Sequence, residues 1–319
     1  MKVAACFVGL AFAFSAMGCT VKADDSERFR DPIPQGSDVA VGVPGAGAGG
    51  SRTASADLHV LSDPAGASGA AQYYVFTRAI TDVVDVGSAM ILGSVWAVVH
   101  SPPTSLSAHA AVWGPSGDAL SPVVWRFTVN EVGDHEYDYA LEGRPKGSIS
   151  DADYRVVLRG HGFGKERAEH RSGWFQGDAD AFRALDPSRA TDNGTTKITY
   201  DLRALPATLD AEIHHTDGSG DASIKVTHEA GGGGAVDIGA LADVSTPKDG
   251  TLENVTLHSR WNGTGAGRAD ARFTSANAQL TVDATECWSS TFQRVYYEDS
   301  ANTQPSTGAA ASCAFPAAR

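Results

Sequence analysis

The sequence predicts a mainly β protein in which one large, curved antiparallel sheet wraps on one long N-terminal helix. Two patterns support this fold class. Between residues 72 and 99, apolar residues recur every three or four positions, as on one face of a helix. From Trp125 onward the period changes to two, and apolar residues alternate with charged ones between turns rich in glycine. We expect about 10 to 12 strands in a meander that forms a half-barrel or barrel-like sheet.

The N-terminus combines a positive charge, an apolar run and a cysteine. Lys2 precedes an apolar stretch over residues 3–17, shorter than the roughly 20 residues of a transmembrane helix. Small residues then lead to Cys19. This arrangement resembles the lipobox of bacterial lipoproteins, although Ala16 stands where that family prefers leucine. The resemblance implies a signal peptide over residues 1–18 and a lipidated Cys19. An ordinary secretory signal that leaves a free Cys19 thiol is the alternative.

Residues 19–68 are expected to form the lipidated cysteine and a disordered tether. The run from residue 42 to residue 56 is almost wholly Gly, Ala, Ser, Val and Pro, which offers too little apolar surface for packing. A flexible chain of this length spans roughly 35 to 40 Å. A single β-rich domain, residues 69–319, would therefore stand off a membrane that holds the N-terminal acyl chains.

Cysteine usage fits an exported protein. Of the four cysteines, Cys6 leaves with the signal peptide and Cys19 is lipidated. Cys287 and Cys313 remain, and in an oxidising compartment they are expected to form one disulfide.

The charge balance excludes some partners. Loss of Lys2 with the signal peptide leaves 24 basic against 38 acidic residues, a net charge of −14. This balance argues against nucleic acid and against docking of the domain on anionic lipids. Membrane contact is therefore expected through the acyl chains alone. Thr20 follows Cys19, and by resemblance the absence of aspartate there favours the outer membrane.

The helix is expected over Gln72 to Val99. From Val86 onward this segment is apolar or small all round, which predicts deep burial. A second membrane span is the competing interpretation, but only about 14 uncharged residues follow Asp85. The prolines at positions 102 and 103 end the helix.

Alternating segments predict the strands, and a short helix is expected over residues 178–185. The turns between strands include Asn193-Gly194, Asp217-Gly218 and Asn262-Gly263. The alternation also fits an outer-membrane barrel, but charges of both signs on the polar face and the long helix favour a sheet wrapped around that helix. The predicted strands are residues 125–130, 137–142, 154–159, 197–203, 209–214, 224–227, 255–261, 271–273 and 280–284.

No motif predicts a catalytic, cofactor or metal site. His214 and His215 are neighbours on a predicted strand and point to opposite faces, so they are poorly placed to share a metal. Residues 217–221 open like a calcium loop, but Ala222 stands at the sixth position, where such a loop needs glycine, and His228 at the twelfth, where it needs glutamate. Trp288, Phe292 and Tyr296 have a helical spacing and are expected to form a packing stripe.

Two resemblances bear on function. The segments NVTLHSRWNGTGAGRADAR (254–272) and ATECW…FQRVYY (284–297) resemble uncharacterised exported proteins of myxobacteria. The topology resembles the half-barrel of Lol-type carriers and of mycobacterial lipid-binding lipoproteins, a likeness of fold that transfers no residues. A lipid-binding role would use the apolar face below the helix, and the candidate ligand-facing residues are Gly87, Gly93, Trp125, Phe127, Tyr137 and Tyr139.

Three functions are compatible with these patterns. The first is a structural or interaction module of the outer envelope, whose charged face meets a protein partner. The second is a lipid or hydrophobic-ligand carrier, with the apolar face as its site. The third is an envelope hydrolase, for which the sequence shows no spacing that assembles a catalytic site.

Overall fold

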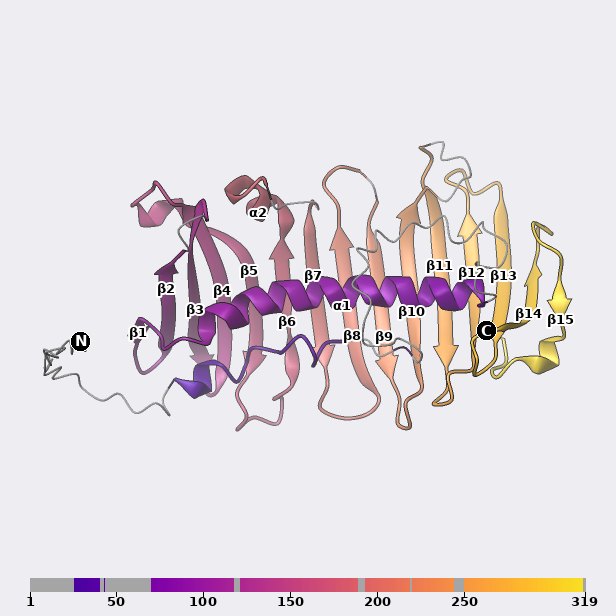
Figure 1. Ribbon diagram of the computed structural model, residues 1–319, viewed down its shortest axis with the longest axis horizontal. Helices are drawn as coiled ribbons and strands as arrows, with labels where there is room; N and C mark the ends of the chain where they lie inside the picture. Colours follow the sequence, from indigo (N-terminus) through magenta and orange to yellow (C-terminus); the bar gives the residue numbers. More distant parts are fainter. Residues whose placement is uncertain are drawn as a thin grey trace, which may run out of the picture.

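The structure is a computed structural model that describes residues 26–40, 43, 70–117, 121–188, 193–218, 220–243 and 250–317. Within these residues, fifteen strands form one antiparallel sheet in chain order, and the sheet does not close on itself (Figure 1). The predicted mainly β fold is confirmed, with more strands than expected. The predicted signal peptide and Cys19 lie outside the described residues.

The helices and strands have the following bounds. The helical elements are η1 (Glu27–Phe29), α1 (Gln72–Val99), η3 (Asp151–Asp153), α2 (Ala179–Leu185) and η4 (Ala310–Ser312). The strands are β1 (Ser105–Leu106), β2 (Ala110–Ser116), β3 (Val123–Gly133), β4 (Glu136–Pro145), β5 (Arg155–Phe163), β6 (Ser172–Asp178), β7 (Thr195–Asp201), β8 (Ala207–His214), β9 (Ala222–His228), β10 (Gly234–Ala242), β11 (Glu253–Trp261), β12 (Gly267–Thr274), β13 (Thr281–Trp288), β14 (Arg294–Asp299) and β15 (Thr307–Gly308).

Two of the strands that the sequence did not predict, β6 and β14, lack a clear alternation for identifiable reasons. In β6, Gly173 and Gly177 occupy positions on the α1 side of the sheet, where an apolar side chain would have marked the strand. A Cβ on Gly177 would lie 3.2 Å from the Cδ1 atom of Ile91 in α1, so the position must be small. In β14, the helical spacing of Phe292 and Tyr296 concealed a hairpin.

The prediction of a packing stripe at residues 288, 292 and 296 is therefore only partly correct. Trp288 and Phe292 both pack on Tyr74 of α1, with ring centroids 5.9 and 4.4 Å away. Tyr296 lies on the other face of β14 and donates a hydrogen bond to Glu298. The turn between β13 and β14 separates the three side chains, because strand residues alternate between faces.

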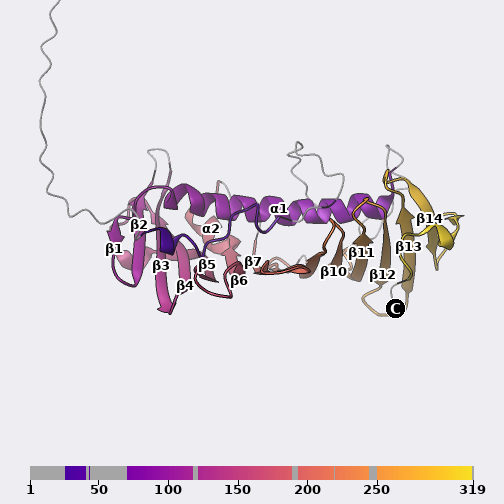
Figure 2. The same ribbon diagram turned by 90° about the horizontal axis from the view of Figure 1, so that it is seen from below.

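Helix α1 has the predicted bounds and crosses the strands on one face of the sheet (Figures 1 and 2). A helix rises ~1.5 Å per residue and strands lie ~4.8 Å apart, so α1 passes one strand about every three residues. Thr77 donates a hydrogen bond to Ser259 of β11 at 2.8 Å, whereas Ile91 lies over Gly177 of β6. Near its ends α1 contacts β11–β13 and β2–β3.

One side of α1 is buried and the other is exposed. Gly93 and Ala97 are exposed, so the prediction of burial all round after Val86 is wrong. Small side chains there leave little apolar surface exposed to water. Among the described helices, none is long and apolar enough to span a membrane. The buried α1 residues are Tyr73, Tyr74, Phe76, Thr77, Thr81, Val84, Ser88, Leu92, Val95 and Val99.

Charges from distant segments hold both ends of α1. The first turn carries no acidic residue and the last turn no basic one. Instead, the fully buried carboxylate of Glu286 accepts a hydrogen bond from the Tyr73 backbone N–H and pairs with Arg294. At the other end, Arg30 donates to the Val99 carbonyl at 2.8 Å. A negative charge at the N-terminus and a positive one at the C-terminus both complement the helix dipole.

Part of the predicted tether belongs to the folded domain. The prediction of disorder is wrong for residues 26–40, because Phe29, Ile33 and Val39 are buried in the core. This segment runs beside α1 (Figure 1), and the Phe29 ring lies 5.7 Å from the ring of Tyr137. The Trp96 indole donates to a backbone carbonyl of the segment at 2.9 Å. The side chains of Phe29, Ile33 and Val39 supply the apolar packing surface that the glycine-rich run at residues 42–56 lacks.

We predict that Glu286→Ala destabilises the domain strongly. Removing the buried carboxylate leaves Arg294 without its ion-pair partner and the Tyr73 backbone N–H without its acceptor, and breaking a buried pair in this way typically costs about 3 to 5 kcal/mol. Urea unfolding measures the change in free energy. Asp283→Ala on the same strand is the matched control, because its pair with Arg272 is exposed and is worth less than about 1 kcal/mol. Equal effects of the two variants would contradict the assigned role of Glu286.

Candidate functional site

The face of the sheet opposite α1 carries one continuous line of polar side chains, here called the polar row. Each member is the register partner of the next, and each strand from β4 to β14 contributes one. Their chain neighbours on either side point toward α1 and form much of the core. The polar row consists of Asp138, His161, Trp174, Thr199, Asp210, Lys225, Asp237, His258, Asp270, Thr285 and Glu298.

Near the middle of the polar row, basic side chains stand opposite carboxylates. The Lys225 Nζ atom lies 3.9 Å from an Asp210 carboxylate oxygen, and His258 Nδ1 contacts the next carboxylate, Asp237. Opposite charges directly across two strands stabilise a sheet modestly. These groups are half-exposed, with 57% of the Lys225 side chain and 52% of the Asp237 side chain accessible. They therefore remain available to a ligand.

A groove lies along the centre of this face. It has a volume of about 1010 Å³ and extends over β7–β13. A second groove of about 630 Å³ adjoins it over β6–β11. Both include Glu212, Ser223, Gly239 and Thr256, and the last three lie in register on β9, β10 and β11. These three small residues form a line beside the polar row and make up the floor shared by the two grooves.

The C-terminal segment, residues 309–317, closes one end of the groove. Cys313 forms a disulfide with Cys287 of β13, with a Cα–Cα distance of 5.3 Å, which confirms the predicted pair. Arg260 donates a hydrogen bond to the Pro316 carbonyl at 2.7 Å, and its guanidinium lies 5.3 Å from the centre of the Phe315 ring. Ala317 lines the larger groove.

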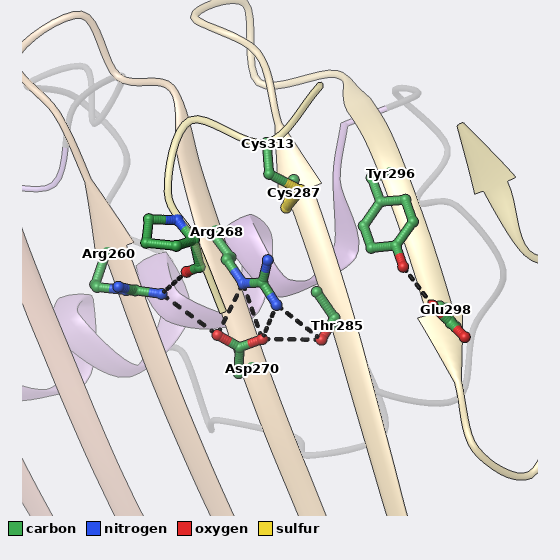
Figure 3. Close-up of a disulfide and its surroundings, with 9 residues drawn as sticks. Arg260, Arg268, Asp270, Thr285, Cys287, Tyr296, Glu298 and Cys313 are labelled. Atoms are coloured by element: carbon green, nitrogen blue, oxygen red, sulfur yellow. Dashed lines mark hydrogen bonds and ion pairs between the residues drawn. A yellow bond between two sulfur atoms is a disulfide. The ribbon is translucent and has the colours of Figure 1, made fainter. Parts of the chain in front are cut away.

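Two arginines converge on one carboxylate beneath this segment. Figure 3 shows the guanidinium groups of Arg260 and Arg268 directed at Asp270, next to the disulfide. Arg268 Nη2 lies 2.6 Å from an Asp270 oxygen, and Arg260 Nη2 lies 3.5 Å from the other. Thr285 Oγ1 also donates to Asp270 at 2.8 Å. The shared carboxylate connects β11, β12 and β13 on the polar face.

The residues predicted to face a ligand lie on the opposite side of the sheet. Phe127, Tyr137 and Tyr139 are buried there, and Trp125 is half-buried. Their rings pack on other rings: Trp125 on Phe182 at 5.7 Å, Phe127 on Trp113 at 6.0 Å and on Tyr139 at 6.1 Å.

The two tyrosine hydroxyls are neutral. Burial raises the pKa of Tyr139 well above its usual value and that of Tyr137 to about 12. A Cβ on Gly160 would lie 2.3 Å from the Tyr139 ring, so this ring packs directly against a glycine backbone. The aromatic residues predicted to face a ligand therefore pack together in the hydrophobic core on the α1 side of the sheet.

The two helix glycines are placed differently. Gly93 is on the exposed side of α1, with no atom within 4 Å of the position where a Cβ would stand. Gly87 lies within α1. Cys19 falls outside the described residues.

No local pattern in the sequence marks the polar row as one unit. Its charged members were recognised only as the polar face of each strand, and Trp174 lies on the unpredicted β6. Pairing the strands through their Asn-Gly and Asp-Gly turns would have aligned part of the row. His214 pairs with Asp221 at 2.8 Å. The described residues contain no group of three or more side chains arranged to hold a metal ion.

No known protein family, no curated protein and no solved structure matches this chain. The polar face is therefore interpreted from its own geometry and chemistry.

We predict that the double variant Cys287→Ser, Cys313→Ser is less stable by about 3 to 4 kcal/mol, the loop-closure term for a cross-link of this length. Limited proteolysis should also cut the C-terminal segment faster than in the parent, because the disulfide holds that segment on the polar face. Unfolding in urea and mass spectrometry of the fragments measure both effects. An unchanged cleavage rate after residue 309 would show that the other contacts hold this segment by themselves.

Proposed function

We propose that this protein is an exported, lipid-anchored lipoprotein of the outer envelope that works as an interaction module. In this proposal Cys19 carries the acyl chains, the remaining N-terminal segment is the tether, and the polar face of the sheet binds a partner outside the membrane. The resemblance of residues 1–19 to a lipoprotein signal supports the anchor.

The continuous polar row is the observation that carries the binding role. Helix α1 and residues 26–40 cover the apolar face, so the polar face is the broad accessible surface of the sheet. Both grooves lie on the polar face, and the strand register and ion pairs fix the positions of the side chains that line them. A site on strands of one sheet is more rigid than a site on loops.

The packing of the apolar face favours an interaction module over a lipid carrier. A carrier needs accessible apolar surface below the helix, where Phe127 and Tyr139 instead pack on neighbouring rings. A hydrolase needs a nucleophile next to a base. The histidines of the polar row, His161 and His258, face carboxylates.

We predict that a photo-crosslinking amino acid placed at Thr256 in living cells captures an envelope component. Thr256 is exposed on the floor of both grooves, so a partner bound to this face lies within reach. The same amino acid at Ala97, on the exposed side of α1, is the matched control. Gel electrophoresis and mass spectrometry identify the adduct.

Capture from position 256 but not from position 97 is the expected result. No capture from either position, or equal capture from both, would contradict a binding role for the polar face. The anchor is checked in the same cells with Cys19→Ala, which should move the protein from the membrane fraction to the soluble fraction. Retention of this variant in the membrane would contradict lipidation at Cys19.

A further inference from the structure

We infer that the groove on the polar face binds a linear, uncharged polysaccharide that runs along the polar row, across the strands. This inference rests on the proposed function and names the chemical class of its partner. Four features of the groove carry it: its charge balance, its hydrogen-bonding groups, its spacing and an aromatic ring beside it.

Charged and polar groups of both signs line the larger groove. The acidic residues in its lining are Asp210, Glu212, Asp237, Asp270 and Asp283, and the basic ones are Lys225, His258, Arg268 and Arg272. Each basic group pairs with one of the carboxylates. A polyanion would meet five carboxylates, and the net charge of −13 for the full sequence further disfavours it. A polycation would have to displace Lys225, Arg268 and Arg272 from the carboxylates with which they pair.

The paired groups keep hydrogen-bonding capacity for hydroxyls. A carboxylate accepts about four hydrogen bonds and an arginine donates five, so one ion pair leaves several of these free. The side chain of Asp283 is 54% accessible and that of Arg272 is 61% accessible. A sugar ring presents adjacent hydroxyls that both donate and accept. Such a ligand can use both partners of each pair without breaking it.

The spacing of the row fits an extended glycan better than a peptide. Successive members of the row stand on neighbouring strands, ~4.8 Å apart, whereas an extended peptide repeats its side-chain direction every ~6.6 Å. The rise per sugar of an extended pyranose chain is close to the strand separation. Peptide addition to the sheet edges is also disfavoured, since β1 and β15 have only two residues each.

Trp174 provides a stacking surface on the polar row, one strand beyond the lining of the larger groove. It is the register partner of Thr199, which lines the larger groove, and it is half-exposed on the polar face. Lys197 Nζ lies 5.7 Å and the Arg159 guanidinium 6.0 Å from the ring centre. Aromatic rings contribute large contact areas at little entropic cost. A sugar face on this ring would direct the chain toward Asp210 and Lys225.

Isothermal titration calorimetry on the mature chain carrying Cys19→Ala tests the inference. The uncharged probes are the β-1,4-linked chains cellohexaose and the hexamer of N-acetylglucosamine, and the anionic probe is hexagalacturonate. We expect at least one uncharged hexamer to bind and hexagalacturonate not to bind. Trp174→Ala and Asp237→Asn should each weaken binding about tenfold, the factor that corresponds to ~1.4 kcal/mol.

Glu142→Gln is the matched control. Glu142 is ion-paired with Arg126 at 3.0 Å on the same face, but it belongs neither to the polar row nor to the lining of either groove. The affinity of Glu142→Gln for the hexamers should therefore stay within about twofold of that of the parent. Thermal unfolding verifies that all three variants fold. Binding of none of the uncharged hexamers, equal binding of hexagalacturonate, or equal losses in Glu142→Gln would overturn the inference. A discrete protein captured from Thr256 would overturn it too, while leaving the proposed function standing.

Discussion

The buried carboxylate of Glu286 fixes the first turn of α1 to the far end of the sheet, and the rest of the arrangement depends on this contact. Helix α1 precedes every strand in the chain, yet its N-terminus rests on β13 and β14, near the C-terminal end of the sheet. Arg30 holds the other end at β2 and β3. With both ends held, the helix must cross the strands that lie between, and it meets about one strand per turn.

Closing one face of the sheet determines what the other face can do. The α1 side contains the aromatic core, the N-terminal segment and the buried stripe of the helix. The polar side carries pairs such as Lys225 with Asp210, whose positions follow from strand register rather than from loop conformation. Because the meander has no crossover, register transmits one line of polar side chains across eleven strands. The binding surface is thus a product of the topology.

Local patterns revealed most of the fold, and long-range contacts account for what they missed. The bounds of α1, the short helix after Asp178 and the Cys287–Cys313 pair were predictable from period, capping chemistry and cysteine usage. β6 was not, because Gly177 makes room for Ile91. The packing of residues 26–40 depends on Phe29 reaching Tyr137, a partner about a hundred residues away. The polar row required the register of all strands, which no single segment encodes.

Accessibility of the polar face in living cells tests the central claim, that this face is occupied by a partner. A cysteine introduced by Thr256→Cys is labelled with a charged maleimide, first in cells whose outer membrane has been made permeable to the reagent and then in purified protein. Ala97→Cys is labelled in parallel. If a partner occupies this face, position 256 is protected in cells but not in purified protein, and position 97 is labelled equally in both. Equal labelling of position 256 in both settings would contradict the claim.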